Sequence, residues 1–177
     1  MGSQFTYITD EQTELIRNSP VFFVASAASD LSAGPEDQGP VNLSPKGATP
    51  LHVIDANHVA YLDYRGSGNE TARHAASEGP VTVMIMSMGK EDAGIIRLYG
   101  HAKVVALEES SLADELKADA SETIGLAMRQ VVEVTVESTQ TSCGYGVPVF
   151  EFVEQRTKFG RGRRYKPARA EAKQPSS

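Results

Sequence analysis

Short apolar runs, many of them alternating with polar residues, dominate the hydrophobic pattern of the chain. In residues 131–138, VVEVTVES, the side chains of Val132, Val134 and Val136 fall on one face of a strand, which predicts a half-buried strand. Further runs predict strands at 21–28, 41–43, on both sides of a turn at 55–57 within 52–64, and at 81–86, 94–107 and 149–153. About seven short strands with tight turns favour a small barrel over a parallel α/β sheet.

Helical patterns are fewer and lie between the strands. Residues 9–18 have a capping residue and acids at their start, and Pro20 ends the pattern. Two more helices are expected at 108–117 and 122–128, in a segment rich in Ala, Leu and Glu. Gly100 marks an expected bulge or bend in the 94–107 strand.

The stretch 61–74, YLDYRGSGNETARH, has the pattern of a strand end, a polar turn and a helix start. Ser67 and Glu70 have the spacing of a capping box, and a helix is expected from about Asn69 to the next Gly-Pro pair. A helix N-terminus beside two glycines, with Arg65 nearby, would suit a phosphate group. An ordinary capped turn is the alternative.

Composition indicates one ordinary domain. The chain has 177 residues, of which 40% are hydrophobic, and this is enough for a core. Its single cysteine excludes an internal disulfide and fits a reducing compartment. No apolar stretch is long enough to span a membrane and no signal-peptide pattern is present, so we expect a cytoplasmic protein.

Charge is distributed unevenly along the chain. Eight of the seventeen Lys and Arg residues lie between Arg156 and Lys173, where Glu171 is the single acid. We therefore expect a flexible basic tail at 156–177, with an arm over a partner subunit or a weak RNA contact as alternatives. The remaining residues, with 22 acids against nine basic side chains, argue against a nucleic-acid-binding body.

Conventional catalytic signatures are absent: the sequence contains no Walker loop, G-x-G-x-x-G, G-x-S-x-G or H-E-x-x-H. No metal site is expected, because metal-ligand spacing is missing from the four histidines, His52, His58, His74 and His101. Cys143 could be a reactive thiol, but a small buried side chain is the favoured interpretation. No catalytic acid or base is assigned, although His74 and Tyr145 have suitable chemistry.

Four polar clusters at strand ends together carry a family resemblance. They are NLSPKG (42–47), DYRGSGNET (63–71), RLYG (97–100) and QTSCGYG (140–146). Their order and spacing over about residues 5–155 resemble the pyridoxamine 5′-phosphate oxidase-like, FMN-binding split-barrel family. The resemblance implies a mainly β (α+β) fold over residues 1–155, a six-stranded Greek-key split barrel with a few peripheral helices.

The resemblance also implies a homodimer with FMN in each of two clefts between the subunits, and a small-molecule substrate. Ser44 and Lys46 would lie along the flavin, with Lys46 near the pyrimidine edge, where positive charge stabilises the anionic reduced flavin. The strand-turn-helix would supply phosphate contacts from Arg65, Gly66, Ser67, Asn69 and Thr71. Arg97 would make a second phosphate or ribityl contact. The segment that reaches the flavin across the dimer interface would contain Gln140, Ser142 and Cys143.

The chain also departs from the true oxidases of this family, which end with a Trp and an Arg-x-His-type segment. It contains no Trp. Ser67, Gly68 and Asn69 replace the Ser-Arg-Lys phosphate clamp, so that Arg65 or Arg73 would supply the positive charge. Vitamin B6 oxidation is therefore not expected.

We expect an FMN-dependent oxidoreductase in which flavin N5 accepts hydride from a reduced donor, such as NAD(P)H or a small organic molecule. Oxygen or an organic acceptor would then take up the electrons. Two alternatives stay open, a flavin-binding carrier or sensor without turnover and the same barrel with haem or a deazaflavin.

Overall fold

The computed structural model describes residues 2–32, 39–66, 68–90, 93–121 and 125–157. Its elements are, in chain order, β1 (Ser3–Phe5), α1 (Asp10–Asn18), β2 (Phe22–Ala27), β3 (Val41–Lys46), β4 (His52–Asp55), β5 (His58–Tyr64), α2 (Glu70–Ala76), β6 (Pro80–Met86), β7 (Gly94–Ala106), α3 (Ala113–Ala118) and β8 (Met128–Cys143). The described strand pairs are all antiparallel.

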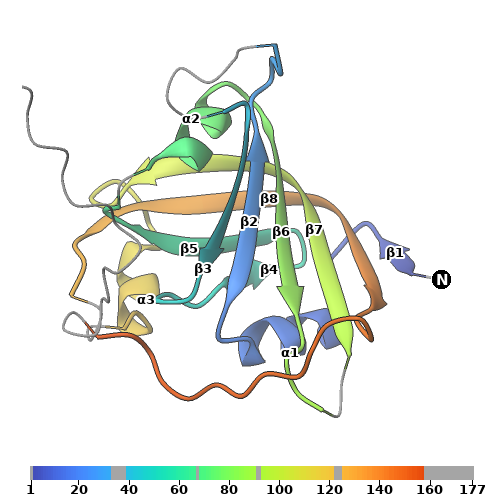
Figure 1. Ribbon diagram of the computed structural model, residues 1–177. Helices are drawn as coiled ribbons and strands as arrows, with labels where there is room; N and C mark the ends of the chain where they lie inside the picture. The colour runs from blue at the N-terminus through green and yellow to red at the C-terminus, as the bar shows by residue number, and fades with distance from the viewer. Residues whose placement is uncertain (1, 33–38, 67, 91–92, 122–124, 158–177) are drawn as a thin grey trace, which may run out of the picture.

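One curled sheet forms the body of the molecule. Its strand order is β3-β2-β6-β7-β8-β5-β4, and β1 pairs with β8. The long strands β7 and β8 bend strongly, so that β5 and β4 lie behind β2 and β3 (Figure 1). The sheet is not closed, because β3 and β4 stand at the two ends of this order. The expected mainly antiparallel β fold with few helices is confirmed, with eight strands in the described sheet rather than six.

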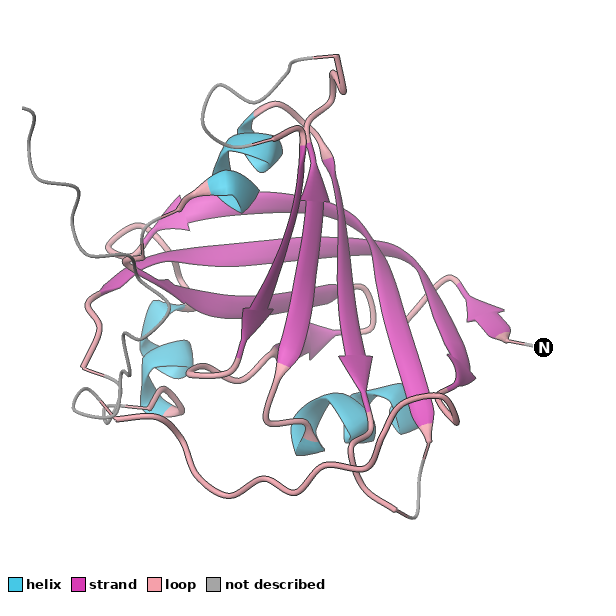
Figure 2. Cartoon of the chain, viewed as in Figure 1, coloured by secondary structure: helices cyan, strands magenta, loops and turns pink. Residues whose placement is uncertain are grey.

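The three helices lie at the rim of the curled sheet. Figure 2 shows α1 at one end, α2 at the opposite end and α3 beside β5. The inner face carries the main core, in which the ring of Phe22 meets that of Tyr61 edge-on at 5.2 Å. Strand β5 is buried on both faces, because Val59 faces this core while Leu62 packs in a second cluster with Leu116 of α3.

Local sequence signals placed several features correctly. Helix α1 begins after Thr9, whose hydroxyl accepts from the Gln12 amide at 3.3 Å, while the Gln12 side chain accepts from the Thr9 amide at 3.1 Å. The expected bulge is confirmed, since the β7–β8 register shifts between Tyr99 and Gly100. Helix α2 starts after Asn69 as expected, although the Asn69 side chain makes no capping bond. The capping box predicted for Ser67 and Glu70 cannot be compared, because Ser67 lies outside the described residues.

Two predictions about the C-terminal half are wrong, and a third is right only in part. Residues 125–127 are not helical and Met128 already begins β8, whose ladders with β5 and β7 override helix propensity. The helix expected at 108–117 is shorter, Ala113–Ala118. Residues 149–153 form no strand within the described chain, where their backbone bond from Phe150 to the Met88 carbonyl (3.0 Å) is not continued as a ladder.

Candidate functional site

A charged cleft of about 390 Å³ opens where β3, the end of β5, the start of α2 and the start of β8 meet. It is lined by Asn42, Ser44, Pro45, Lys46, Asp63, Tyr64, Gly66, Gly68, Asn69, Glu70, Thr71 and Arg129. The strand order places β3 at one end of the sheet, four positions from its neighbour in the cleft, β8. Curling of the sheet therefore creates this cleft.

The Asp63 carboxylate accepts hydrogen bonds from three side chains at the cleft. The Lys46 ammonium donates to Asp63 Oδ1 at 2.9 Å, and the Arg129 guanidinium donates to Asp63 Oδ2. Gln130 Nε2 also donates to Oδ2, at 2.9 Å, and reaches Asn69 Oδ1 at 3.0 Å. Because Arg129 also donates to the Gly68 carbonyl at 3.3 Å, these bonds attach the loop before α2 to the sheet.

The electrostatics of Asp63 follow from these contacts. Burial of the carboxyl would raise its pKa, but the neighbouring charges and hydrogen bonds of Lys46 and Arg129 outweigh that effect and lower the pKa. Below the cleft, burial and, to a lesser extent, the charge of Asp63 raise the pKa of Tyr61. Asp63 is therefore a carboxylate at neutral pH and Tyr61 a neutral phenol.

Two buried polar atoms of the cleft residues have no partner within the described structure. They are Ser44 Oγ and Arg129 Nε. A buried hydroxyl without a hydrogen bond costs about 1–3 kcal/mol, so an unpaired one facing a cleft is a feature that a ligand can satisfy. Lys46, two residues along β3, lines the same cleft, and its ammonium stands 5.7 Å from the centre of the Tyr61 ring.

The structure brings some predicted site residues together and separates others. Five of them line the cleft: Ser44, Lys46, Gly66, Asn69 and Thr71. Arg65 and Arg73, the side chains expected to supply positive charge, are exposed and do not line it. Arg129 takes that place in the cleft wall instead.

Arg97, Gln140, Ser142 and Cys143 form a second group near the other end of β8. Arg97 Nη1 donates to Ser142 Oγ at 3.0 Å, and the Tyr99 hydroxyl donates to Gln140 Oε1 at 3.0 Å. Gln140 lies ten positions along β8 from Gln130, the residue that bonds Asp63, which is roughly 30 Å along the strand. Cys143 is exposed, so its interpretation as a small buried side chain is wrong.

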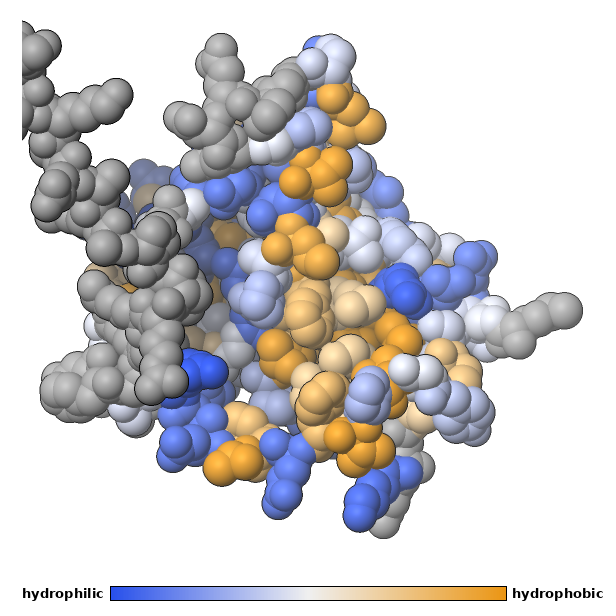
Figure 3. Space-filling view, in the orientation of Figure 1, coloured by the Kyte–Doolittle hydropathy of each residue, from blue (hydrophilic) through white to orange (hydrophobic). Residues whose placement is uncertain are grey.

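Arg97, Gln140 and Ser142 of this group share one face of the sheet, which none of the described helices covers. The register aligns Phe23, Met84, Arg97 and Gln140 in one row across β2, β6, β7 and β8. On the edge strand β3 the side chain of Leu43 is 66% exposed. Figure 3 shows hydrophobic side chains gathered over β2 and β6 on this face.

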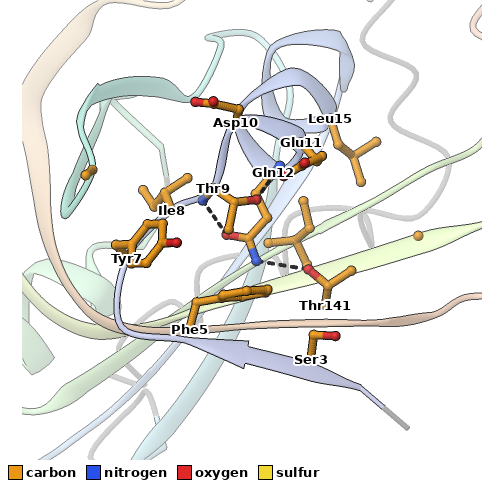
Figure 4. Close-up of a pocket in the computed structure, with 13 residues that line it drawn as sticks. Ser3, Phe5, Tyr7, Ile8, Thr9, Asp10, Glu11, Gln12, Leu15 and Thr141 are labelled. Atoms are coloured by element: carbon orange, nitrogen blue, oxygen red, sulfur yellow. Dashed lines mark hydrogen bonds between the residues drawn. The ribbon is translucent and has the colours of Figure 1, made fainter.

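A larger pocket, of about 860 Å³, lies between β1 and the start of α1 and contains none of the predicted site residues. Phe5, Tyr7 and Leu15 contribute to its lining. Figure 4 shows that Gln12 bridges Thr9 and Thr141 across it, with 2.9 Å between Gln12 Nε2 and Thr141 Oγ1. Because this buried amide is already satisfied, the pocket lacks the unpaired polar atoms of the charged cleft.

Neither residue considered as a general acid or base lines the cleft. His74 is buried and its Nδ1 lies 2.9 Å from Ser26 Oγ, so that it fastens α2 to β2. Tyr145 is 89% exposed, beyond the end of β8. In the described ranges, no three His, Cys, Asp or Glu side chains are grouped as metal ligands, and no helix is long and apolar enough to cross a membrane.

Sequence reasoning missed Arg129 and did not assign Asp63 a role, although Asp63 belongs to the quoted 63–71 cluster. The sequence marks Arg129 only as a basic residue just before the alternating run 131–138. Its relevance depends on the pairing of β5 with β8, which sets Asp63 opposite Gln130. No local pattern gives that register.

Comparison with known proteins finds one similar curated protein and several similar folds. No protein-family model matches the chain. The pyridoxamine 5′-phosphate oxidase family protein ustO of Aspergillus flavus is 30% identical over 146 residues, covering 81% of this chain and 55% of that protein. The chain is similar to this pyridoxamine 5′-phosphate oxidase family protein over most of its own length. It spans about half the length of this curated relative.

Several solved structures share the fold of this chain. A putative pyridoxamine 5′-phosphate oxidase from Lactobacillus delbrueckii matches with a TM-score of 0.54 and 19% identity, over 76% of this chain and 94% of that one. HupZ from Group A Streptococcus has a TM-score of 0.53 and 20% identity, over 73% and 90%. An FMN-binding protein from Syntrophomonas wolfei has a TM-score of 0.54 and 14% identity, over 74% and 86%. At these identities the likeness shows the split-barrel fold.

Proposed function

We propose that this chain binds a flavin, specifically FMN, in the charged cleft. The observation that carries the proposal is the buried, unpaired Ser44 hydroxyl in a cleft that Lys46 also lines. The homology to the pyridoxamine 5′-phosphate oxidase family and the fold shared with an FMN-binding protein support a flavin as the ligand.

In this proposal the cleft residues divide between the two ends of the cofactor. Ser44 and Lys46 contact the ring and ribityl chain, with Lys46 at the pyrimidine edge. Asn69 and Thr71 lie on the phosphate side, with Arg129 in place of Arg65 or Arg73 as the nearest guanidinium. The Arg129 guanidinium supplies charge there and holds the Gly68 carbonyl at 3.3 Å, which keeps the loop in place.

The proposal includes a second copy of the chain. The second group of predicted contacts, led by Arg97 and Gln140, lies too far along β8 to reach the cleft of its own subunit. It stands on the uncovered apolar face, which includes Leu43 at the sheet edge. A homodimer would cover this face and bring the group to the partner's flavin.

We further propose that the assembly is an oxidoreductase for a small-molecule substrate. The bound flavin supplies the redox chemistry, accepting hydride at N5 from a reduced donor, and the protein supplies position and electrostatics. This activity, unlike vitamin B6 oxidation, needs neither the missing Trp nor the Ser-Arg-Lys run.

The deciding experiment is the visible absorption spectrum of the purified chain, followed by release and identification of any chromophore. Flavin bands and released FMN are the expected result. Ser44→Ala should weaken FMN binding by about fivefold, since it removes one hydrogen bond of roughly 1 kcal/mol. The matched control is Ser111→Ala, an exposed serine before α3. A colourless protein that takes up no added FMN would contradict the proposal.

A further inference from the structure

The Lys46 ammonium does not stand alone in the cleft. Asp63 Oδ1 accepts from it at 2.9 Å, and the Asp63 side chain is only 9% exposed. The second carboxylate oxygen is used by Arg129 and Gln130. The carboxylate is thereby held against Lys46 by partners on β8 and cannot turn away.

This arrangement reduces the positive charge that Lys46 presents to a ligand. Opposite charges at 2.9 Å compensate one another strongly when solvent is largely excluded. Solvent is limited here, since the Lys46 side chain is 22% exposed and the Tyr61 ring beneath it is fully buried. A ligand at Lys46 therefore experiences an ion pair rather than a free ammonium.

Building on the flavin site proposed above, we propose that Asp63 is a positioning and tuning residue, which holds Lys46 at the flavin and offsets its charge. Asp63 acts through Lys46 and needs no contact with the flavin. It thereby sets how strongly the site favours the reduced cofactor.

The sign follows from the charge of the reduced cofactor. Uptake of two electrons and one proton converts neutral oxidised flavin into its anionic reduced form. Lys46 stabilises that negative charge and raises the reduction potential, whereas the Asp63 carboxylate opposes it. Removing the carboxylate should therefore shift the potential to more positive values.

The test compares the reduction potential of bound FMN in the full chain and in Asp63→Asn, by dithionite titration with a reference dye. We expect a more positive potential in the variant, equivalent to a several-fold increase in the preference for reduced over oxidised FMN. Should Asp63→Asn fail to fold, Asp63→Ser also removes the charge but keeps an acceptor.

Glu70→Gln is the matched control. Glu70 lines the same cleft, and this variant removes the same unit of charge without touching the Lys46 and Asp63 contact. We expect a clearly smaller shift than in Asp63→Asn. Equal shifts would mean that net cleft charge acts alone and would overturn the role assigned to Asp63.

The other outcomes separate this inference from the flavin proposal. A chain without FMN contradicts the proposed function itself. Bound FMN whose potential is unchanged in Asp63→Asn, even with altered affinity, would leave the flavin site standing and overturn the inference.

Discussion

Asp63 joins parts of the sheet that no backbone ladder connects. It lies on β5, and Lys46 lies on β3 at the far end of the strand order. Their ion pair therefore spans the gap of the open barrel, beside the bonds from Arg129 and Gln130. Asp63, a residue of the cleft, thus also helps to hold β3 against β5 across the opening of the sheet.

This role makes stability depend on pH with a definite sign. Because the folded pKa of Asp63 lies below its unfolded value, its contribution is present above that unfolded value, near 4, and is lost as pH falls through the folded pKa. Asp63→Asn should lower the free energy of unfolding at pH 7 by about 2 kcal/mol and flatten its fall in acid. Urea unfolding between pH 3 and 7 measures both.

Asp114→Asn is the control for this prediction. Asp114 is fully exposed and pairs with Lys117 at 3.3 Å, a surface contact of small value. It should change the unfolding free energy by a few tenths of a kcal/mol. An Asp63→Asn curve parallel to that of the unmodified chain would show that the ion pair does not stabilise the fold.

The bend of strand β7 depends on the bulge at Gly100. The register with β8 shifts there, and the backbone comes so close that a Cβ at position 100 would collide with the Thr135 carbonyl oxygen. The bulge helps both strands to bend, and their bend brings β5 round behind β2. A small residue is thus required by the curvature of the sheet.

Gly100→Ala should lower the unfolding free energy by about 2–3 kcal/mol, because backbone atoms must move to admit the methyl group. Thermal and urea unfolding measure the loss. Gly146→Ala is the control, since a Cβ there meets nothing within 4 Å. Similar stabilities of the two variants would mean that the bulge can widen without cost.

At the scale of the molecule, one apolar face of the sheet is left uncovered by the helices of the described chain. Val41 and Leu43 on the edge strand β3 are 64% and 66% exposed, beside the row that contains Arg97. Contiguous exposed apolar surface of this kind marks an interaction site, and the proposed dimer would bury it.

Leu43→Lys should therefore shift the protein from dimer to monomer and release flavin together with the partner. Sedimentation velocity gives the mass, and absorbance at the flavin bands gives the bound cofactor. Ile54→Lys, at the opposite sheet edge and 36% exposed, should leave both unchanged. An unmodified chain that sediments as a monomer would contradict the dimer.

The sequence by itself determined the features that depend on near neighbours. The alternation of Val132, Val134 and Val136 specified the face of β8 that is buried, and a capping residue followed by acids specified the start of α1. Gly100 marked its bulge. The family resemblance of the NLSPKG cluster singled out Ser44 and Lys46, which the structure places in the cleft wall, while their contact with a flavin stays a prediction. The basic tail at 156–177 stays a prediction.

Only the tertiary structure decided which strand ends meet. Lys46 and Asp63 are 17 residues apart, and Asp63 and Arg129 are 66 apart, so their contacts depend on ladder register and on the curl of the sheet. The same long-range pairing turned Met128 into a strand residue and carried Arg97 away from the cleft. Local propensity contributes fractions of a kcal/mol per residue to the free energy of folding, whereas a strand ladder with a buried face contributes far more. Where the two disagree, the strand ladder therefore decides the secondary structure.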